Sequence, residues 1–213
     1  MQLGGFTIAE PMTLLTDYVL GALAVVFGRQ LLSMSEARPI RAWGWAFIAL
    51  AAGAFAGGTA HGFAHYLDPL GKTLTWKITV YSIGVAVFFM FAGTARAALS
   101  RATARWVVAL AGLKLAAYLA WMTTHDDFRY VVYDYVPTML AVLALGMWIA
   151  RRLGNPAGNR LALGVLVSLA GAGIQLSEIR LHQHFNANDL YHVVQMFGLW
   201  LFYHGARGLN SRD

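Results

Sequence analysis

Apolar residues in this sequence gather into seven long stretches, each separated from the next by a short polar segment. An α-helix needs about 20 mostly apolar residues to cross the hydrocarbon layer of a bilayer, and every stretch reaches that length. The predicted helices span residues 10–33, 40–66, 73–99, 103–124, 129–152, 160–181 and 187–208.

The joints between these stretches carry glycine, proline or charged residues, as in 35–39, 68–72 and 154–158. Joints this short force neighbouring helices to run antiparallel. Seven crossings use nearly all of the 213 residues, which leaves no room for a second domain. The sequence therefore predicts one all-α domain over residues 1–213, an integral membrane bundle of seven transmembrane helices.

Composition supports a multi-pass protein of the cell membrane. Hydrophobic residues make up 58% of the chain and charged residues 12%, whereas roughly a quarter of the residues in a soluble domain are charged. The chain has no cysteine, which excludes disulfides, thiolate metal sites and cysteine nucleophiles.

Basic residues concentrate at one end of the predicted helices. Those that share this end are Arg29, Arg38, Arg41, Arg96, Arg101, Arg105, Arg151, Arg152, Arg160, Arg207 and Arg212. By the positive-inside rule, the amino terminus is expected outside and the carboxyl terminus in the cytoplasm. The net charge of +6 is then explained by contact with an anionic leaflet, and no nucleic-acid partner is predicted.

Histidines and carboxylates gather at the opposite, outer end. His61 and His65 stand four residues apart in the second predicted helix, so both project from one face. Asn188, His192 and Gln195 share a face at the start of the seventh. Further polar residues expected at this depth are Glu10, Asp17, His125, Asp126, Asp127, Asp134, Glu178, His182 and His184.

Polar residues near a bilayer are costly and usually mark a site. Imidazole with carboxylate suits zinc, and a catalytic zinc site has three protein ligands and an open water position. The candidate zinc ligands are His61, His65 and His192, with Glu178 or Asp189 orienting a ligand or acting as base.

Simpler roles remain open for the same residues. A histidine at a helix end can hydrogen-bond a neighbouring carbonyl, and Asp126 with Asp127 can form a solvated turn that caps the fifth helix. Lys77 and Lys114 lie inside predicted helices and need a counter-ion, for which Asp17 or Asp134 is available. Glycines of the second and sixth helices are expected to allow close helix packing; they are Gly53, Gly57, Gly58, Gly164, Gly171 and Gly173.

The segments Gly58–His65 and Asn188–Val193 resemble motifs of the seven-helix superfamily of alkaline ceramidases and adiponectin/progestin-type receptors. The resemblance implies a zinc-dependent hydrolase that cleaves an amide in a lipid. It places His65 on the helix 2 ligand and His192 on the second helix 7 ligand. His61 stands where that family has serine, Asn188 replaces the first helix 7 histidine, and helix 3 offers no aspartate.

The sequence is therefore consistent with three functions. The first is a metal-dependent membrane hydrolase that acts on a lipid amide or ester entering from the membrane. The second is a non-enzymatic metal- or haem-binding accessory subunit, which joins partner chains in a membrane complex and uses His65 and His192 as axial haem ligands. The third is a transporter or receptor whose acidic outer vestibule captures cations.

Overall fold

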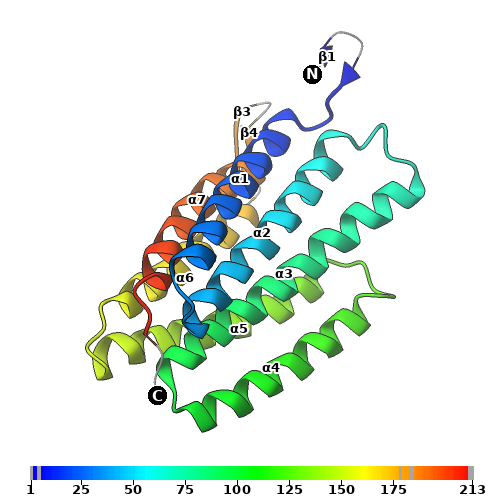
Figure 1. Cartoon of the computed structure of the whole chain (residues 1–213). Helices are drawn as coiled ribbons and strands as arrows, with labels where there is room; N and C mark the ends of the chain where they lie inside the picture. Colours follow the sequence, from blue (N-terminus) through cyan, green and yellow to red (C-terminus); the bar gives the residue numbers. More distant parts are fainter. Residues whose placement is uncertain (1, 4–5, 178, 183–184, 211–213) are drawn as a thin grey trace.

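The computed structural model describes residues 2–3, 6–177, 179–182 and 185–210. Within them the chain is all-α apart from two short hairpins, which confirms the all-α part of the expected fold class (Figure 1). The helices are α1 (Pro11–Met34), α2 (Arg38–Gly62), α3 (Pro69–Ala98), α4 (Arg101–Trp121), α5 (Arg129–Arg152), α6 (Ala157–Gln175) and α7 (Ala187–Ala206).

Both hairpins lie at the end of the bundle where α1 and α7 begin (Figure 1). In the first, β1 (Gln2–Leu3) pairs with β2 (Phe6–Thr7), and in the second β3 (Arg180–His182) pairs with β4 (Phe185–Asn186). The second hairpin occupies part of the stretch predicted to end the sixth helix, because α6 ends at Gln175. His182 therefore lies in a strand.

Helices that follow one another in the chain run in opposite directions, so the packed pairs α1–α7 and α3–α5 are parallel. α1, α2 and α3 pack in sequence, α5 lies between α3 and α6, and α7 packs on both α6 and α1. Trp43 of α2 and Phe202 of α7 are fully buried, and their ring centroids lie 5.2 Å apart. α4 stands apart from the others and packs mainly on α3 (Figure 1).

Glycines allow close approach at two of these crossings. A Cβ atom at Gly58 would lie 2.9 Å from Cβ of Asp17 in α1, and one at Gly164 would lie 2.7 Å from the ring of Phe202. A Cβ at Gly173 would meet nothing within 4 Å. The packing role expected for these glycines is therefore confirmed at Gly58 and Gly164, whereas Gly173 has open space.

The two lysines inside helices have partners. Lys114 Nζ lies 2.5 Å from Asp134 Oδ1 and donates to Thr138 Oγ1 at 2.9 Å, which ties α4 to α5. Lys77 Nζ lies 2.7 Å from Asp126 Oδ1 and also donates to the carbonyl of Met122. The expected counter-ion for Lys114 is thus Asp134.

Asp127 lies next to Asp126 in the joint between α4 and α5. Asp127 accepts hydrogen bonds from the backbone N–H of Arg129 at 2.9 Å and from its side-chain Nε at 2.6 Å. These hydrogen bonds lower the pKa of Asp127 below its usual value, because they favour the charged carboxylate. The solvated turn considered for Asp126 and Asp127 fits this exposed position.

In the described part of the chain, α1 to α6 are long and apolar enough to cross a membrane. Such helices are those of a membrane protein. α7 is 20 residues long, but its first half carries Asn188, Asp189, His192 and Gln195, which lower its hydropathy. The seventh crossing and the orientation of the bundle stay predictions.

Candidate functional site

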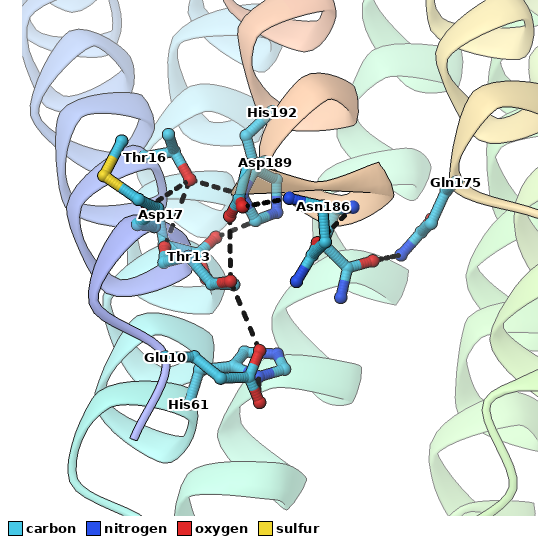
Figure 2. A network of polar contacts seen from close by, with 11 residues as sticks. Glu10, Thr13, Thr16, Asp17, His61, Gln175, Asn186, Asp189 and His192 are labelled. Atoms are coloured by element: carbon cyan, nitrogen blue, oxygen red, sulfur yellow. Dashed lines mark hydrogen bonds and ion pairs between the residues drawn. The ribbon is translucent and has the colours of Figure 1, made fainter. Parts of the chain in front are cut away.

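Polar side chains from three helices meet where α1 and α7 begin and α2 ends (Figure 2). We call this group the polar cluster; its members are Glu10, Thr13, Thr16, Asp17, His61, Asp189 and His192.

Helical spacing brings these side chains to one face. Thr13, Thr16 and Asp17 follow at intervals of three and four residues along α1, and Asp189 and His192 are three apart in α7. All five are buried, with Asp189 0% and Asp17 6% exposed. Buried polar groups need partners, and the α1–α7 interface supplies them.

Asp189 has both carboxylate oxygens engaged. Oδ1 accepts a hydrogen bond from the Thr13 hydroxyl at 2.8 Å, and Oδ2 accepts one from the backbone N–H of Asn186 at 2.7 Å. The second bond belongs to a capping box in which the Asn186 side chain accepts from the first turn of α7. Asp189 therefore fixes the start of α7 and docks it on α1.

His192 is held through both ring nitrogens. Nδ1 lies 2.9 Å from Thr16 Oγ1, and Nε2 lies 3.3 Å from Asp17 Oδ1. An ionised Asp17 can only accept a hydrogen bond, so its contact with Nε2 is attractive when Nε2 carries a proton. Nδ1 then accepts from Thr16 in the neutral ring, or donates to Thr16 Oγ1 in the imidazolium. The Thr16 hydroxyl can serve either state, because the carbonyl of Met12 lies 2.9 Å away as its alternative acceptor.

His61 and Glu10 form a second imidazole–carboxylate pair at the rim of the cluster. His61 Nδ1 lies 3.2 Å from Glu10 Oε1, and the two side chains are 38% and 43% exposed. The Thr13 hydroxyl lies 3.2 Å from Glu10 Oε2 and so connects this pair to Asp189.

The polar cluster is rich in negative charge. It combines three carboxylates, Glu10, Asp17 and Asp189, with two imidazoles. Within the residues that the structure describes, no lysine or arginine forms an ion pair with these carboxylates. The electrostatic balance of the cluster therefore depends on protons or on a bound cation.

The three predicted zinc ligands do not lie together in the structure. His192 and His61 enter the cluster, whereas His65 lies in an exposed turn beyond the end of α2. α2 ends at Gly62 because the Gly62 carbonyl accepts from the backbone N–H of Ala9, and Tyr66 N–H turns back to the Phe63 carbonyl. His61 and His65 are thus no longer on one helical face. Across residues 2–3, 6–177, 179–182 and 185–210, no group of three or more histidines and acidic residues is arranged to hold a metal ion.

The other predicted partners also differ in position. Glu178, the candidate base or orienting carboxylate, and His184 lie outside the described residues. Gln195 shares the buried face of α7 but donates to Ser168 Oγ of α6 at 3.1 Å. Asn188 accepts from Gln175 of α6 at 3.0 Å. These two residues join α6 to α7 rather than extending the cluster.

The sequence predicts Glu10 and Asp17 at the outer end of the first helix. Thr13 and Thr16, which make the contacts to α7, were not predicted. The available signal was their spacing, since Glu10, Thr13, Thr16 and Asp17 recur at helical intervals in an otherwise apolar stretch.

Comparison with known proteins gives a family and no activity. No curated protein and no solved structure matches the sequence. A family model described as a family of unknown function (DUF6962) matches residues 12–211. Because this match covers almost the whole chain, the protein belongs to the DUF6962 family.

Proposed function

We propose that this chain is a cation-responsive membrane protein, a transporter or receptor, whose polar cluster binds and releases a proton. The observation that carries the proposal is the His192–Asp17 pair, buried between α1 and α7 and engaged through both ring nitrogens. Buried ionisable residues in membrane helices commonly serve proton relays or ion pathways.

Proton binding at this pair changes the contact between two helices. With neutral His192, an ionised Asp17 faces an uncharged ring nitrogen 3.3 Å away and has no basic partner in the described cluster. When a proton arrives at Nδ1, the ring becomes an imidazolium that forms an ion pair with Asp17, and Thr16 turns its hydroxyl to a backbone carbonyl. The α1–α7 contact therefore changes with the proton, because an ion pair replaces the contact between a carboxylate and a neutral ring, and its attraction is set against the cost of burying two charges. Loss of that proton reverses the change.

Thermal unfolding of the purified chain in lipid nanodiscs at several pH values tests this proposal. The unfolding midpoint of the wild type should change with pH across the histidine range, and Asp17→Asn and His192→Gln should both flatten that dependence. Glu36→Gln is the control, since it removes an exposed carboxylate at the opposite end, which pairs with Arg41. An Asp17→Asn protein with the pH dependence of the wild type would rule the proposal out.

A metal-dependent hydrolase for a lipid amide or ester is the second candidate. It is favoured by the presence of two imidazoles from different helices, His61 and His192, each with a carboxylate partner, because histidine ligands of zinc usually have such a partner. In this case Glu10 is better placed than Asp189 to act as base, since Glu10 is partly exposed whereas both oxygens of Asp189 are occupied. His65 has no assigned role.

Elemental analysis and an absorption spectrum separate the two candidates and the haem-binding alternative. Stoichiometric zinc that is lost in His61→Gln and His192→Gln would favour the hydrolase over the proton-binding protein. A Soret band would favour an accessory subunit that binds haem. The axial pair expected for haem gains no support from the contacts, because His65 is exposed in a turn while His192 is buried against α1.

A further inference from the structure

Four arginines surround one cavity at the end of the bundle opposite the polar cluster. The cavity has a volume of about 780 Å³ and is lined by residues where α2 begins, α3 ends and α4 begins. Its basic lining consists of Arg38, Arg96, Arg101 and Arg105, which we call the arginine pocket. α4 can form one wall because it stands away from the rest of the bundle.

None of the described carboxylates neutralises the charges of the arginine pocket. In the part of the chain that the structure describes, no carboxylate forms an ion pair with any of the four guanidinium groups. Glu36 also lines the cavity, but its carboxylate pairs with Arg41 at 3.1 Å. Arg38 and Arg96 are close enough for their charges to repel each other. An anion between them would remove this repulsion.

The remaining lining is apolar. Ala104 and Val108 of α4, together with Pro39 of α2, complete the wall of the cavity. A cavity with arginines at its rim and an apolar wall can bind an amphiphile, with the anionic headgroup at the arginines and the apolar part along the wall. A guanidinium group can donate two parallel hydrogen bonds to a phosphate group. Basic pockets between membrane helices bind the headgroups of anionic lipids.

We propose that the arginine pocket binds a phosphate group, carried by an anionic phospholipid whose chains lie along α4. Ordinary topology anchoring explains arginines spread over this end of the bundle. It does not require four arginines from three helices to line a single cavity in which none of the described carboxylates pairs with them. The proposal does not depend on the function of the polar cluster, which lies at the other end.

Native mass spectrometry of the full chain, released from detergent with phosphatidylglycerol or phosphatidylcholine added, tests the proposal. We expect one phosphatidylglycerol per chain to be retained in preference to phosphatidylcholine. Arg96→Gln/Arg101→Gln should weaken that binding by about tenfold or more, since each basic residue near an anionic headgroup contributes on the order of 1 kcal/mol.

The matched control is Arg151→Gln/Arg152→Gln, which removes the same charge from the same end of the bundle but outside the pocket. It should leave the preference unchanged, and Arg96→Lys/Arg101→Lys should retain part of it. Circular dichroism of each variant checks that the helices are intact. Equal losses in the pocket and control variants, with intact helices, would overturn the proposal, because binding would then follow surface charge alone.

A second arm with inorganic phosphate distinguishes the two sources of the ligand. If phosphate competes with phosphatidylglycerol and the competition is lost in Arg96→Gln/Arg101→Gln, the pocket recognises the phosphate group itself. If phosphate binds there and phosphatidylglycerol does not, the pocket is a phosphate site for a soluble ligand, and the phospholipid part of the proposal is wrong. Failure of both probes to bind the wild type would overturn the proposal.

Discussion

Asp17 and Asp189 are both buried carboxylates of the polar cluster, yet their contacts assign them different roles. Asp189 is fully occupied by Thr13 and by the backbone of Asn186, whereas Asp17 faces the ring of His192. The contacts of Asp189 hold the start of α7 in place, whereas the contact of Asp17 is with an imidazole, which can bind and release a proton. Variants at these two positions should therefore differ in kind.

We expect Asp189→Ala to lower the free energy of unfolding by about 2 kcal/mol, because the variant loses a helix cap and leaves the buried Thr13 hydroxyl with a poorer partner. The pH dependence of stability should remain. Asp189→Asn keeps an acceptor oxygen and should lose less. Unfolding by denaturant in detergent measures both, and an Asp189→Ala protein as stable as the wild type would contradict the capping role.

The ion pair between Lys114 and Asp134 makes a second prediction at this scale. Lys114→Met leaves the buried Asp134 carboxylate without its cation and should lower the free energy of unfolding by about 3 kcal/mol. Lys114→Met/Asp134→Leu removes both charges and should recover most of that loss. The same unfolding assay compares the single and double variants. A double variant as unstable as the single one would show that packing, not charge, holds α4 to α5.

At the scale of helices, two glycines of α6 provide a matched pair. Gly164→Ala should destabilise the bundle, since the new Cβ would lie 2.7 Å from the fully buried ring of Phe202. Gly173→Ala has space and should stabilise it by about 0.5–1 kcal/mol, the gain in helix propensity over glycine. Thermal unfolding of the two proteins side by side decides the sign of each effect. Changes of the same sign would contradict the assigned α6–α7 crossing.

The helices themselves could be predicted from the sequence because hydropathy alone marks them. The stretch 129–152 coincides with α5, and 10–33 differs from α1 by one residue at each end. The ends of α2 and α6 could not be predicted in this way. α2 ends where the Gly62 carbonyl bonds to Ala9, and α6 ends where Ser177 N–H tightens the last turn onto the Ile174 carbonyl. Contacts of this kind carry no periodic signal.

The candidate site was predictable only as a set of residues at one depth. Polarity at helix ends identifies Glu10, Asp17, His61 and His192, but it does not give the rotation of one helix about its axis relative to another. The contacts of Thr13 with Asp189 and of Thr16 with His192 each join residues 176 positions apart. They depend on how α1 packs on α7. His65 lies outside for a separate reason, because α2 ends at Gly62 and the chain turns away before His65.

At the scale of the whole molecule, α7 decides the topology of the chain. The described α1 to α6 meet the length and hydropathy of membrane-spanning helices, and α7 carries the polar residues of the cluster. In the bundle, however, α7 packs along α6 and α1 and runs from the end where α1 begins toward the end where α1 finishes (Figure 1). Its path therefore follows the direction expected of a seventh crossing.

Single cysteines test this topology directly, because the natural chain contains none. Thr124→Cys lies exposed in the joint between α4 and α5, at the end that holds the polar cluster, and Asn210→Cys lies exposed just after α7. In intact cells, a membrane-impermeant maleimide should label Thr124→Cys and should reach Asn210→Cys only after permeabilisation, since arginines concentrate at the latter end. Asn159→Cys, exposed at the start of α6, is the control for the arginine-rich side. If Asn210→Cys is labelled like Thr124→Cys while Asn159→Cys is protected, α7 does not cross. If only Asn159→Cys and Asn210→Cys are labelled, the bundle is inverted and the polar cluster faces the cytoplasm.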